Sequence, residues 1–480
     1  MLFLKKVIKK YIFPQDKKIF KAVWLLALPV IISNLSRVLM SLVDVAMVGH
    51  LGPEALAATG MGGVLMWGAL SLVLGIRTSV QTVAARRLGQ NKKEECIKAL
   101  NNGFLLAAGY SLPISLLGWA YGVDIIPLFI VDDITTPLAI SYFSISSVGL
   151  FFNAISFVFQ GFYTGIEKTR VLLNVTITSN IINAYLNAGL IYGKQAIGNI
   201  FNDFFYGYVD VSMFWFWADF EGQGVTGAAI GTLIASVWMM GHYSFYLIRQ
   251  PIIKKSSGLI SLGIDRQLLF RQVKLSLPMG VQETMIAIGW SVFYKIMALI
   301  GIIELATTQL LFTIMHASFM PALGVGQACA TLVGKHMGSR EIEKSEKSII
   351  ESLRIAEYIM GSMGLLFILF PELILSLFTG DQKIIDIGTW GLRLIGVIQF
   401  IDAVGFTMFL ALTGAGNTFF PAMVESALIW FFMLPLSYYF GVVINGGFRP
   451  PWIVFAIYLL LMATILALKV KKGDWKEIEV

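Results

Sequence analysis

Charged residues are scarce in this 480-residue chain. Asp, Glu, Lys and Arg make up 14% of it, whereas hydrophobic residues make up 57%, and the mean hydropathy is +0.76. A soluble domain carries about 25% charged residues. The composition therefore excludes a soluble enzyme, a nucleic-acid-binding protein and a disordered chain. It favours an all-α membrane protein that crosses the bilayer many times.

Cysteine and histidine are also scarce. Cys96 and Cys329 are too few for a disulfide framework or a cysteine metal site. No two of the four histidines have the spacing of metal ligands, and the sequence has no GxSxG, Walker A or HExxH motif. We therefore expect no catalytic residues, no cofactor and no ATPase activity in this chain.

Long apolar runs account for most of the chain. A membrane-spanning helix needs about 20 apolar residues, whereas a membrane β-strand would alternate over about 10 residues. The runs are continuous, so they predict helices, which satisfy their own backbone in lipid. We predict twelve transmembrane helices at 22–48, 55–85, 95–120, 136–163, 170–192, 223–248, 272–298, 303–334, 345–370, 384–413, 419–440 and 450–469.

Lys and Arg are concentrated on one side of the predicted membrane. Both tails and the links after helices two, four, six and eight carry 29 of the 36 basic residues. The opposite side carries only Lys194, Lys383 and Arg449. Because cytoplasmic loops are enriched in Lys and Arg, we expect a multi-pass protein of the cytoplasmic (inner) membrane with both termini in the cytoplasm. The net charge of +7 then reflects topology.

The chain repeats itself with a shift of 249 residues, which aligns Pro29 with Pro278 and Gly165 with Gly414. Each repeat holds six predicted helices. Six is an even number, so both repeats enter the membrane from the same side, as in transporters with parallel repeats. We expect two lobes around a central cleft. The predicted units are an N-lobe at 1–248 with an outer insertion at 194–222, a cytoplasmic linker at 249–271 and a C-lobe at 272–480.

Polar side chains gather at one depth in the N-lobe. A charge at mid-bilayer costs about 2.5–3.5 kcal/mol, so Asp44 in the first helix needs a partner or a function. Asn183 and Asn187 lie one turn apart in the fifth helix, and Thr232 lies in the sixth. These oxygen-bearing groups can form a site for H⁺ or Na⁺, because hard cations prefer oxygen ligands. The alternative is an asparagine-lined helix interface.

Two acids in the C-lobe also fall near mid-bilayer. Glu283 in the seventh helix and Asp402 in the tenth each lie about 11 residues from the predicted cytoplasmic helix end, hence at one depth. They can share a proton or a cation, or bind a cationic substrate. The alternative is neutralisation by an arginine, whereas Glu425 in the eleventh helix is expected at a helix interface or rim. The candidate counter-ions are Arg37, Arg77 and Arg393.

Four segments resemble the multidrug and toxic compound extrusion (MATE) family, including its NorM and DinF branches. They are LALPVIISNLSRVLMSLVDVAMVGHLG at 26–52, GVTGAAIGT at 224–232, FMPALGVGQACATLVGKHMGS at 319–339 and QFIDAVGFTMFLALTGAGNT at 399–418. The resemblance covers all twelve predicted helices. It implies a cation-coupled antiporter that exports organic cations.

The resemblance also implies residue roles. Asp44 becomes the coupling acid of the N-lobe, with Asn183 and Thr232 beside it. Some members carry a second acid in the fifth helix where this chain has Asn187, as NorM-like members do. Asp402 matches the family's aspartate in the tenth helix. Glu283 lies about one helical turn earlier than the family's usual glutamate in the seventh helix.

We therefore expect an antiporter that works by alternating access and is driven by H⁺ or Na⁺. A Na⁺ ion would bind at Asp44 or Asp402. The expected partners are small organic cations and membrane lipid, not nucleic acid, and we expect a monomer. Two alternatives are a flippase for lipid-linked precursors from the same wider superfamily and a membrane scaffold without transport. Twelve spans and an acidic cleft argue against the flippase, whose relatives usually have more spans and a cationic cleft.

Overall fold

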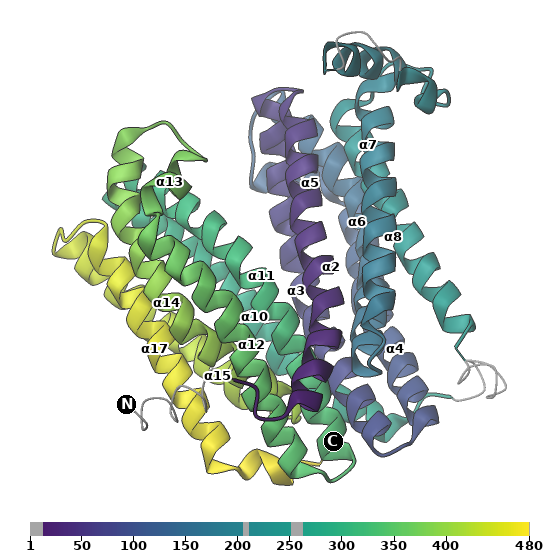
Figure 1. The fold of residues 1–480 in the computed structure, drawn as a ribbon. Coiled ribbons are helices and arrows are strands. Elements are labelled where there is room, and N and C mark those ends of the chain that lie inside the picture. Colours follow the sequence, from purple (N-terminus) through teal and green to yellow (C-terminus); the bar gives the residue numbers. More distant parts are fainter. Residues whose placement is uncertain (1–12, 205–210, 251–262, 480) are drawn as a thin grey trace.

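The computed structural model describes residues 13–204, 211–250 and 263–479, in which all regular secondary structure is helical (Figure 1). Six long helices come from the first half: α2 (Lys17–Gly49), α3 (Pro53–Gly89), α4 (Lys93–Ala120), α6 (Thr135–Gly165), α7 (Thr169–Phe204) and α8 (Gly224–Ile248). Six come from the second half: α10 (Arg266–Ile300), α11 (Ile302–Gly338), α12 (Ile342–Leu369), α14 (Gln382–Gly414), α15 (Phe419–Leu428, continued to Val443) and α17 (Arg449–Lys472).

This is a multi-pass membrane protein. Within the described residues, eleven helices are long and apolar enough to cross a membrane. α7 is not one of the eleven, but it has 36 residues and packs along α2 and α8. Together they match the twelve predicted helices. Exposed apolar side chains such as Leu39, Leu42 and Phe431 suit contact with lipid.

The helices form two bundles, and each has an apolar core (Figure 1). The N-lobe contains α2 to α8, drawn in purple to teal, and the C-lobe contains α10 to α17, drawn in green to yellow. A short helix, α5 (Gly122–Ile125), follows α4, and α13 (Pro371–Ser376) follows α12 at the corresponding place in the C-lobe. The arrangement agrees with the two predicted six-helix repeats.

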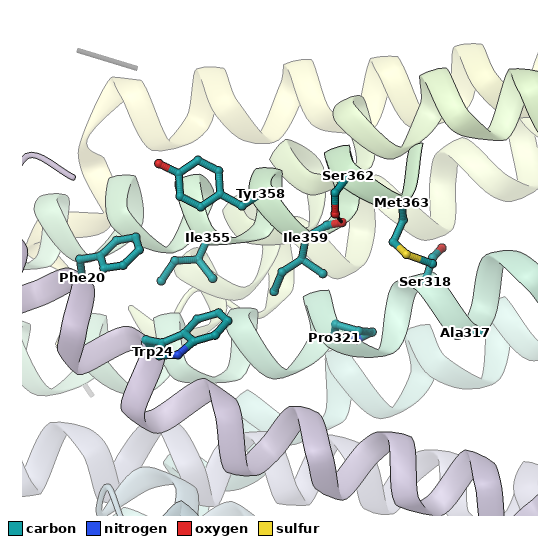
Figure 2. A pocket seen from close by; sticks show the side chains of 10 residues that line it. All are labelled: Phe20, Trp24, Ala317, Ser318, Pro321, Ile355, Tyr358, Ile359, Ser362 and Met363. Atoms are coloured by element: carbon teal, nitrogen blue, oxygen red, sulfur yellow. Dashed lines mark hydrogen bonds between the residues drawn. The ribbon is translucent and has the colours of Figure 1, made fainter. Parts of the chain in front are cut away.

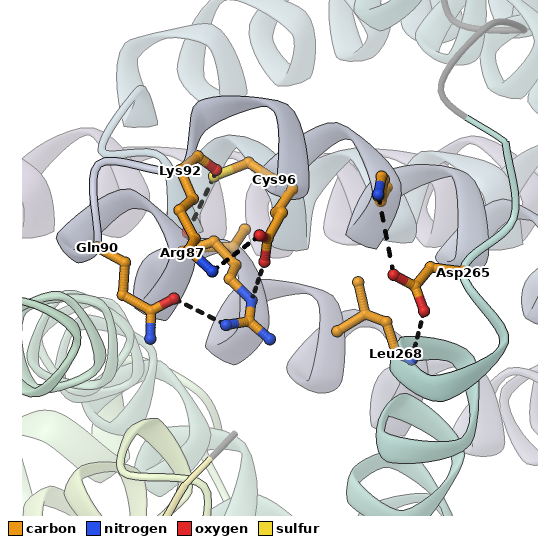
Figure 3. Close-up of polar contacts among 9 residues, drawn as sticks. Arg87, Gln90, Lys92, Cys96, Asp265 and Leu268 are labelled. Carbon is orange, nitrogen blue, oxygen red and sulfur yellow. Dashed lines mark hydrogen bonds and ion pairs between the residues drawn. The ribbon is translucent and has the colours of Figure 1, made fainter.

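The linker predicted at 249–271 ends earlier than expected. α10 begins at Arg266 because Asp265 caps it, accepting hydrogen bonds from the backbone N–H groups of Gln267 and Leu268 at 3.1 Å. Figure 3 shows the bond from Leu268. Residues 251–262 of this linker lie outside the described residues. The apolar run starts later than the helix, so the sequence prediction missed the polar first turns that Asp265 initiates.

The insertion predicted at 194–222 is partly helical. α7 breaks at Gly193, where φ is 73°, and then continues to Phe204, while residues 205–210 lie outside the described residues. The 3-10 helix η2 (Val211–Trp215) follows. The indole N–H of Trp217 then donates to the Tyr185 hydroxyl at 2.8 Å. The described part of the insertion therefore folds back onto α7.

The lobes are in close contact along α3 and α10. A Cβ added at Gly75 would lie 2.2 Å from the carbonyl oxygen of Ser276, so the two backbones touch there. About one turn away, the hydroxyls of Ser71 and Thr284 share a hydrogen bond of 2.7 Å. Among the described residues of α3, none before Ser71 makes a side-chain hydrogen bond to the C-lobe.

All further polar contacts between the lobes, within the described residues, lie on the side where α2 begins and α17 ends, which we call the terminal side. The Gln81 side chain donates to Thr331 at 3.0 Å, and Lys335 pairs with Glu167 at 2.7 Å. On the same side Lys98 of α4 pairs with Asp265 at 3.9 Å. The lobes are thus joined from the middle of the helices to the terminal side.

Both ends of the described chain are bound on the terminal side. The backbone N–H groups of Gln15 and Asp16 donate to the Glu351 carboxylate of α12 at 2.8 and 3.0 Å. At the other end, the 3-10 helix η6 (Asp474–Glu477) buries Trp475, and Arg86 of α3 donates to the Ile478 carbonyl oxygen. The N-terminal segment is therefore bound to the C-lobe, and the C-terminal segment is bound to the N-lobe.

Candidate functional site

The structure brings Asp44 and Asn187 together in the N-lobe. The Asn187 side-chain N–H donates to Asp44 Oδ1 at 2.8 Å, which joins α2 to α7. Asp44 is half-buried, whereas Asn187 is buried and its own Oδ1 has no hydrogen-bond partner. The ring of Tyr142 on α6, which the sequence did not suggest, is close enough for its hydroxyl to interact with the Asp44 charge.

Asn183 and Thr232 form a second, weaker pair one turn along α7. The Asn183 side-chain N–H lies 3.4 Å from the Thr232 hydroxyl oxygen. The neighbouring residue Gly231 lets α8 approach closely, because a Cβ there would lie 2.0 Å from Asn187 Oδ1. Gly231 therefore fixes the position of the amide that holds Asp44. Its role can be seen only once α7 and α8 are packed.

Two arginines lie deeper in the N-lobe. Arg37 donates to the Gln160 side chain at 2.9 Å, so its described hydrogen-bond partner is neutral. Arg77 on α3 lies close enough to Arg37, and across the lobes to Glu283, for their charges to interact. Arg393 is exposed. Within the described residues, no salt bridge joins any of these arginines to Asp44, Glu283 or Asp402.

Three acids of the C-lobe interact, one more than the two that the sequence assigned to a site. Glu425 on α15 interacts electrostatically with both Glu283 on α10 and Asp402 on α14. It accepts a hydrogen bond of 2.7 Å from Gln282 and one of 3.5 Å from the Tyr458 hydroxyl of α17. These bonds put Glu425 at an interface between α10, α15 and α17, which is one of the two expected places. The adjacent pair Gln282-Glu283 was the sequence signal for a polar layer at this depth.

The spacing of the acids limits what they can bind. Within the described residues, no group of three or more His, Cys, Asp and Glu is close enough to hold a metal ion. A Na⁺ ion at Asp44 or Asp402 would therefore need amide, hydroxyl or carbonyl oxygens as its other ligands. In the N-lobe, the side-chain oxygens of Asn187, Asn183 and Thr232 are of that kind.

A separate cavity of about 460 Å³ lies on the terminal half of the molecule (Figure 2). α2 contributes Phe20 and Trp24, and the remaining lining comes from α11 and α12 of the C-lobe, including Pro321 and Tyr358. Its walls are mostly apolar. None of the predicted site residues lines it, so it is distinct from both acid groups.

Comparison with known proteins identifies the family. A sequence model of the MatE family matches the chain twice, at residues 29–188 and 278–439. The chain belongs to the MatE family. The two matches start 249 residues apart (278 − 29), which is the shift found in the sequence, so the MATE repeat coincides with the two lobes. Members of this family are transporters and not enzymes.

Related proteins are similar over nearly their whole length. A probable multidrug resistance protein NorM of Thermotoga maritima is 23% identical, with 94% of this chain and 92% of that protein covered. The multidrug resistance protein NorM of Burkholderia vietnamiensis is also 23% identical, with 92% and 91% covered. This chain is therefore a NorM-like MATE protein.

Solved structures share the fold. A MATE crystal structure in a straight conformation has a TM-score of 0.82 at 20% identity, covering 98% of this chain and 99% of that one. An outward-facing multidrug resistance MATE transporter has a TM-score of 0.81, also at 20% identity, with 96% and 97% covered. At this identity the similarity establishes the fold alone.

Proposed function

We propose that this NorM-like MATE protein exports organic cations from the cytoplasm in exchange for H⁺ or Na⁺, by alternating access between its two lobes. The observation that carries the proposal is the environment of Asp44. Its described hydrogen bond comes from the neutral amide of Asn187. A carboxylate inside the membrane without a cationic partner is costly, so binding of a proton or Na⁺ is favourable there.

The C-lobe acids have the second role in this proposal. Glu283 and Asp402 likewise lack salt bridges among the described residues, and an organic cation that enters between the lobes meets negative charge on the C-lobe side. Drug-like substrates are supported by the names of the relatives, which are multidrug resistance proteins. Both acid groups belong to one chain, which is consistent with a working monomer.

Orientation follows from charge. The terminal side carries most of the Lys and Arg, so we place it in the cytoplasm. The polar contacts between the lobes then lie on the cytoplasmic side, and the described conformation is closed toward the cytoplasm. The inward movement of one charge through 100 mV supplies about 2.3 kcal/mol, equivalent to roughly fiftyfold accumulation.

The test is efflux of ethidium from vesicles that contain the purified protein, with a pH gradient or a Na⁺ gradient imposed separately. We expect one gradient to drive efflux and Asp44→Asn to abolish it. Asp133→Asn, in the exposed loop before α6, is the matched control and should behave as wild type. Full efflux by Asp44→Asn would refute the role of this acid. No flux with either gradient would favour a scaffold.

A further inference from the structure

Glu425 and Gln282 form an incomplete pair in the C-lobe. Gln282 is only 4% exposed, and its side-chain nitrogen donates to Glu425 Oε2 at 2.7 Å. The oxygen of the same amide, Gln282 Oε1, is buried without a hydrogen-bond partner. The unpaired oxygen is bonded to the same carbon as the nitrogen that donates to Glu425. A buried acceptor of this kind requires a donor.

A proton on Glu425 supplies that donor. An ionised carboxylate can only accept hydrogen bonds, whereas a carboxylic acid carries one O–H group. A neutral Glu425 can therefore donate to Gln282 Oε1 while it accepts from the Gln282 nitrogen. The result is a cyclic acid–amide pair with two hydrogen bonds. The described arrangement already contains one of the two.

The two acids near Glu425 oppose a negative charge on it, whereas the hydrogen bonds from Gln282 and Tyr458 favour one. Glu283 on α10 and Asp402 on α14 are the acids that interact with it, and both are negative when ionised. Tyr458 on α17 is the other titratable neighbour, and its hydroxyl lies 3.5 Å from Glu425 Oε1. Glu425 has no salt bridge among the described residues. Four residues later the chain enters a π-helix at Ile429–Met433, a backbone form frequent at functional sites.

We propose that Glu425 is a proton-carrying residue of the transport cycle, and that Gln282 holds its proton in an acid–amide pair. The inference rests on the proposed function with H⁺ as a coupling ion. One proton from water adds to the Glu425 carboxylate, which changes its charge from −1 to 0 and forms the O–H bond. Release of that proton restores the carboxylate and leaves Gln282 Oε1 unpaired.

The first test is infrared difference spectroscopy of the purified protein, which needs no transport. In wild type we expect the C=O band of a hydrogen-bonded carboxylic acid in the membrane interior to persist at neutral pH. It should disappear in Glu425→Gln and shift in Gln282→Leu, which removes the amide. Glu372→Gln, an exposed glutamate of α13, is the control and should leave the band unchanged. If the band persists unchanged in both Glu425→Gln and Gln282→Leu, the proposal is overturned.

The second test counts protons. Binding of ethidium to the detergent-solubilised protein should release about one proton fewer from Glu425→Gln than from wild type, as linkage requires when one titrating group is removed. Glu425→Asp, which keeps a carboxyl group, should restore part of the proton release. If Glu425 had a purely structural role, the number of released protons would not depend on whether this position carries an acid. If wild-type vesicles transport ethidium and Glu425→Gln releases as many protons as wild type, this inference fails and the proposed function stands. If wild type transports nothing, the proposed function fails, and the infrared band still decides the state of Glu425.

Discussion

The substitution Gly75→Ala should push the lobes apart on the terminal side. A methyl group at Gly75 would lie 2.2 Å from the Ser276 carbonyl oxygen and 2.7 Å from the Gly280 nitrogen. Ordinary van der Waals contact begins at 3.4 Å, so the backbones must separate by 1.2 Å (3.4 − 2.2). A movement of that size is enough to break the hydrogen bond between Ser71 and Thr284.

The magnitude follows from packing energies. Extra atoms in a packed interface cost about 1–3 kcal/mol, and a lost hydrogen bond adds about 0.5–1.5 kcal/mol. Alanine also stabilises a helix by about 1 kcal/mol relative to glycine. Gly68→Ala measures that gain alone, because nothing lies within 4 Å of a Cβ at Gly68 on the same helix. Relative to this control, the two costs together are about 1.5–4.5 kcal/mol, which changes the ratio of the two conformations by roughly 10–2,000-fold.

Distances between spin labels test this prediction. Labels at Glu94 and Glu343, exposed positions related by the 249-residue repeat, report the separation of the lobes on the terminal side. The native Cys96 and Cys329 are buried and should label poorly. We expect Gly75→Ala to populate a longer distance that Gly68→Ala does not. Identical distance distributions for the two variants would show that contact at Gly75 does not hold the lobes together.

Two further predictions concern the N-lobe site and the contacts between the lobes. Gly231→Ala should displace Asn187 from Asp44 and strongly lower ion-driven ethidium efflux. Gly241→Ala, which has open space around it on the same helix, should leave efflux unchanged. Equal efflux rates for the two variants would show that the Asn187 amide has no role in transport. Removing the half-buried ion pair between Lys335 and Glu167 should favour opening on the terminal side by about 0.2–1 kcal/mol. A double-mutant cycle on the label distances measures the coupling energy between Lys335 and Glu167. A coupling energy of zero would show that this ion pair does not stabilise the contact between the lobes.

The sequence predicted the helices well because their signal is local. Apolar runs locate the spans, and the repeat locates the lobes without any knowledge of packing. Helix ends were less predictable, because they depend on capping. Asp265 starts α10 ahead of its apolar run, and Gly193 interrupts α7 without ending it.

The site was only partly predictable, for a different reason. One helical period places Asn183 and Asn187 on one face, and equal depth brings Asp44 near them. The partner of an isolated acid depends on how helices rotate and cross, which a single sequence does not specify. The sequence therefore left Glu425 at a helix interface or rim, and only the structure identifies Gln282 and Tyr458 as its partners. Arg393 was a candidate counter-ion, and its side chain is exposed.

The bond between the start of α2 and Glu351 has a consequence for biosynthesis. The backbone N–H of Asp16 finds its acceptor 335 residues further along the chain. At about 5–20 residues per second, a ribosome needs roughly 15–70 seconds to add that length. During this interval the backbone N–H groups of Gln15 and Asp16 lie at the membrane surface and bind water or a temporary partner. The N-terminal segment can therefore form these native hydrogen bonds only after α12 has been synthesised.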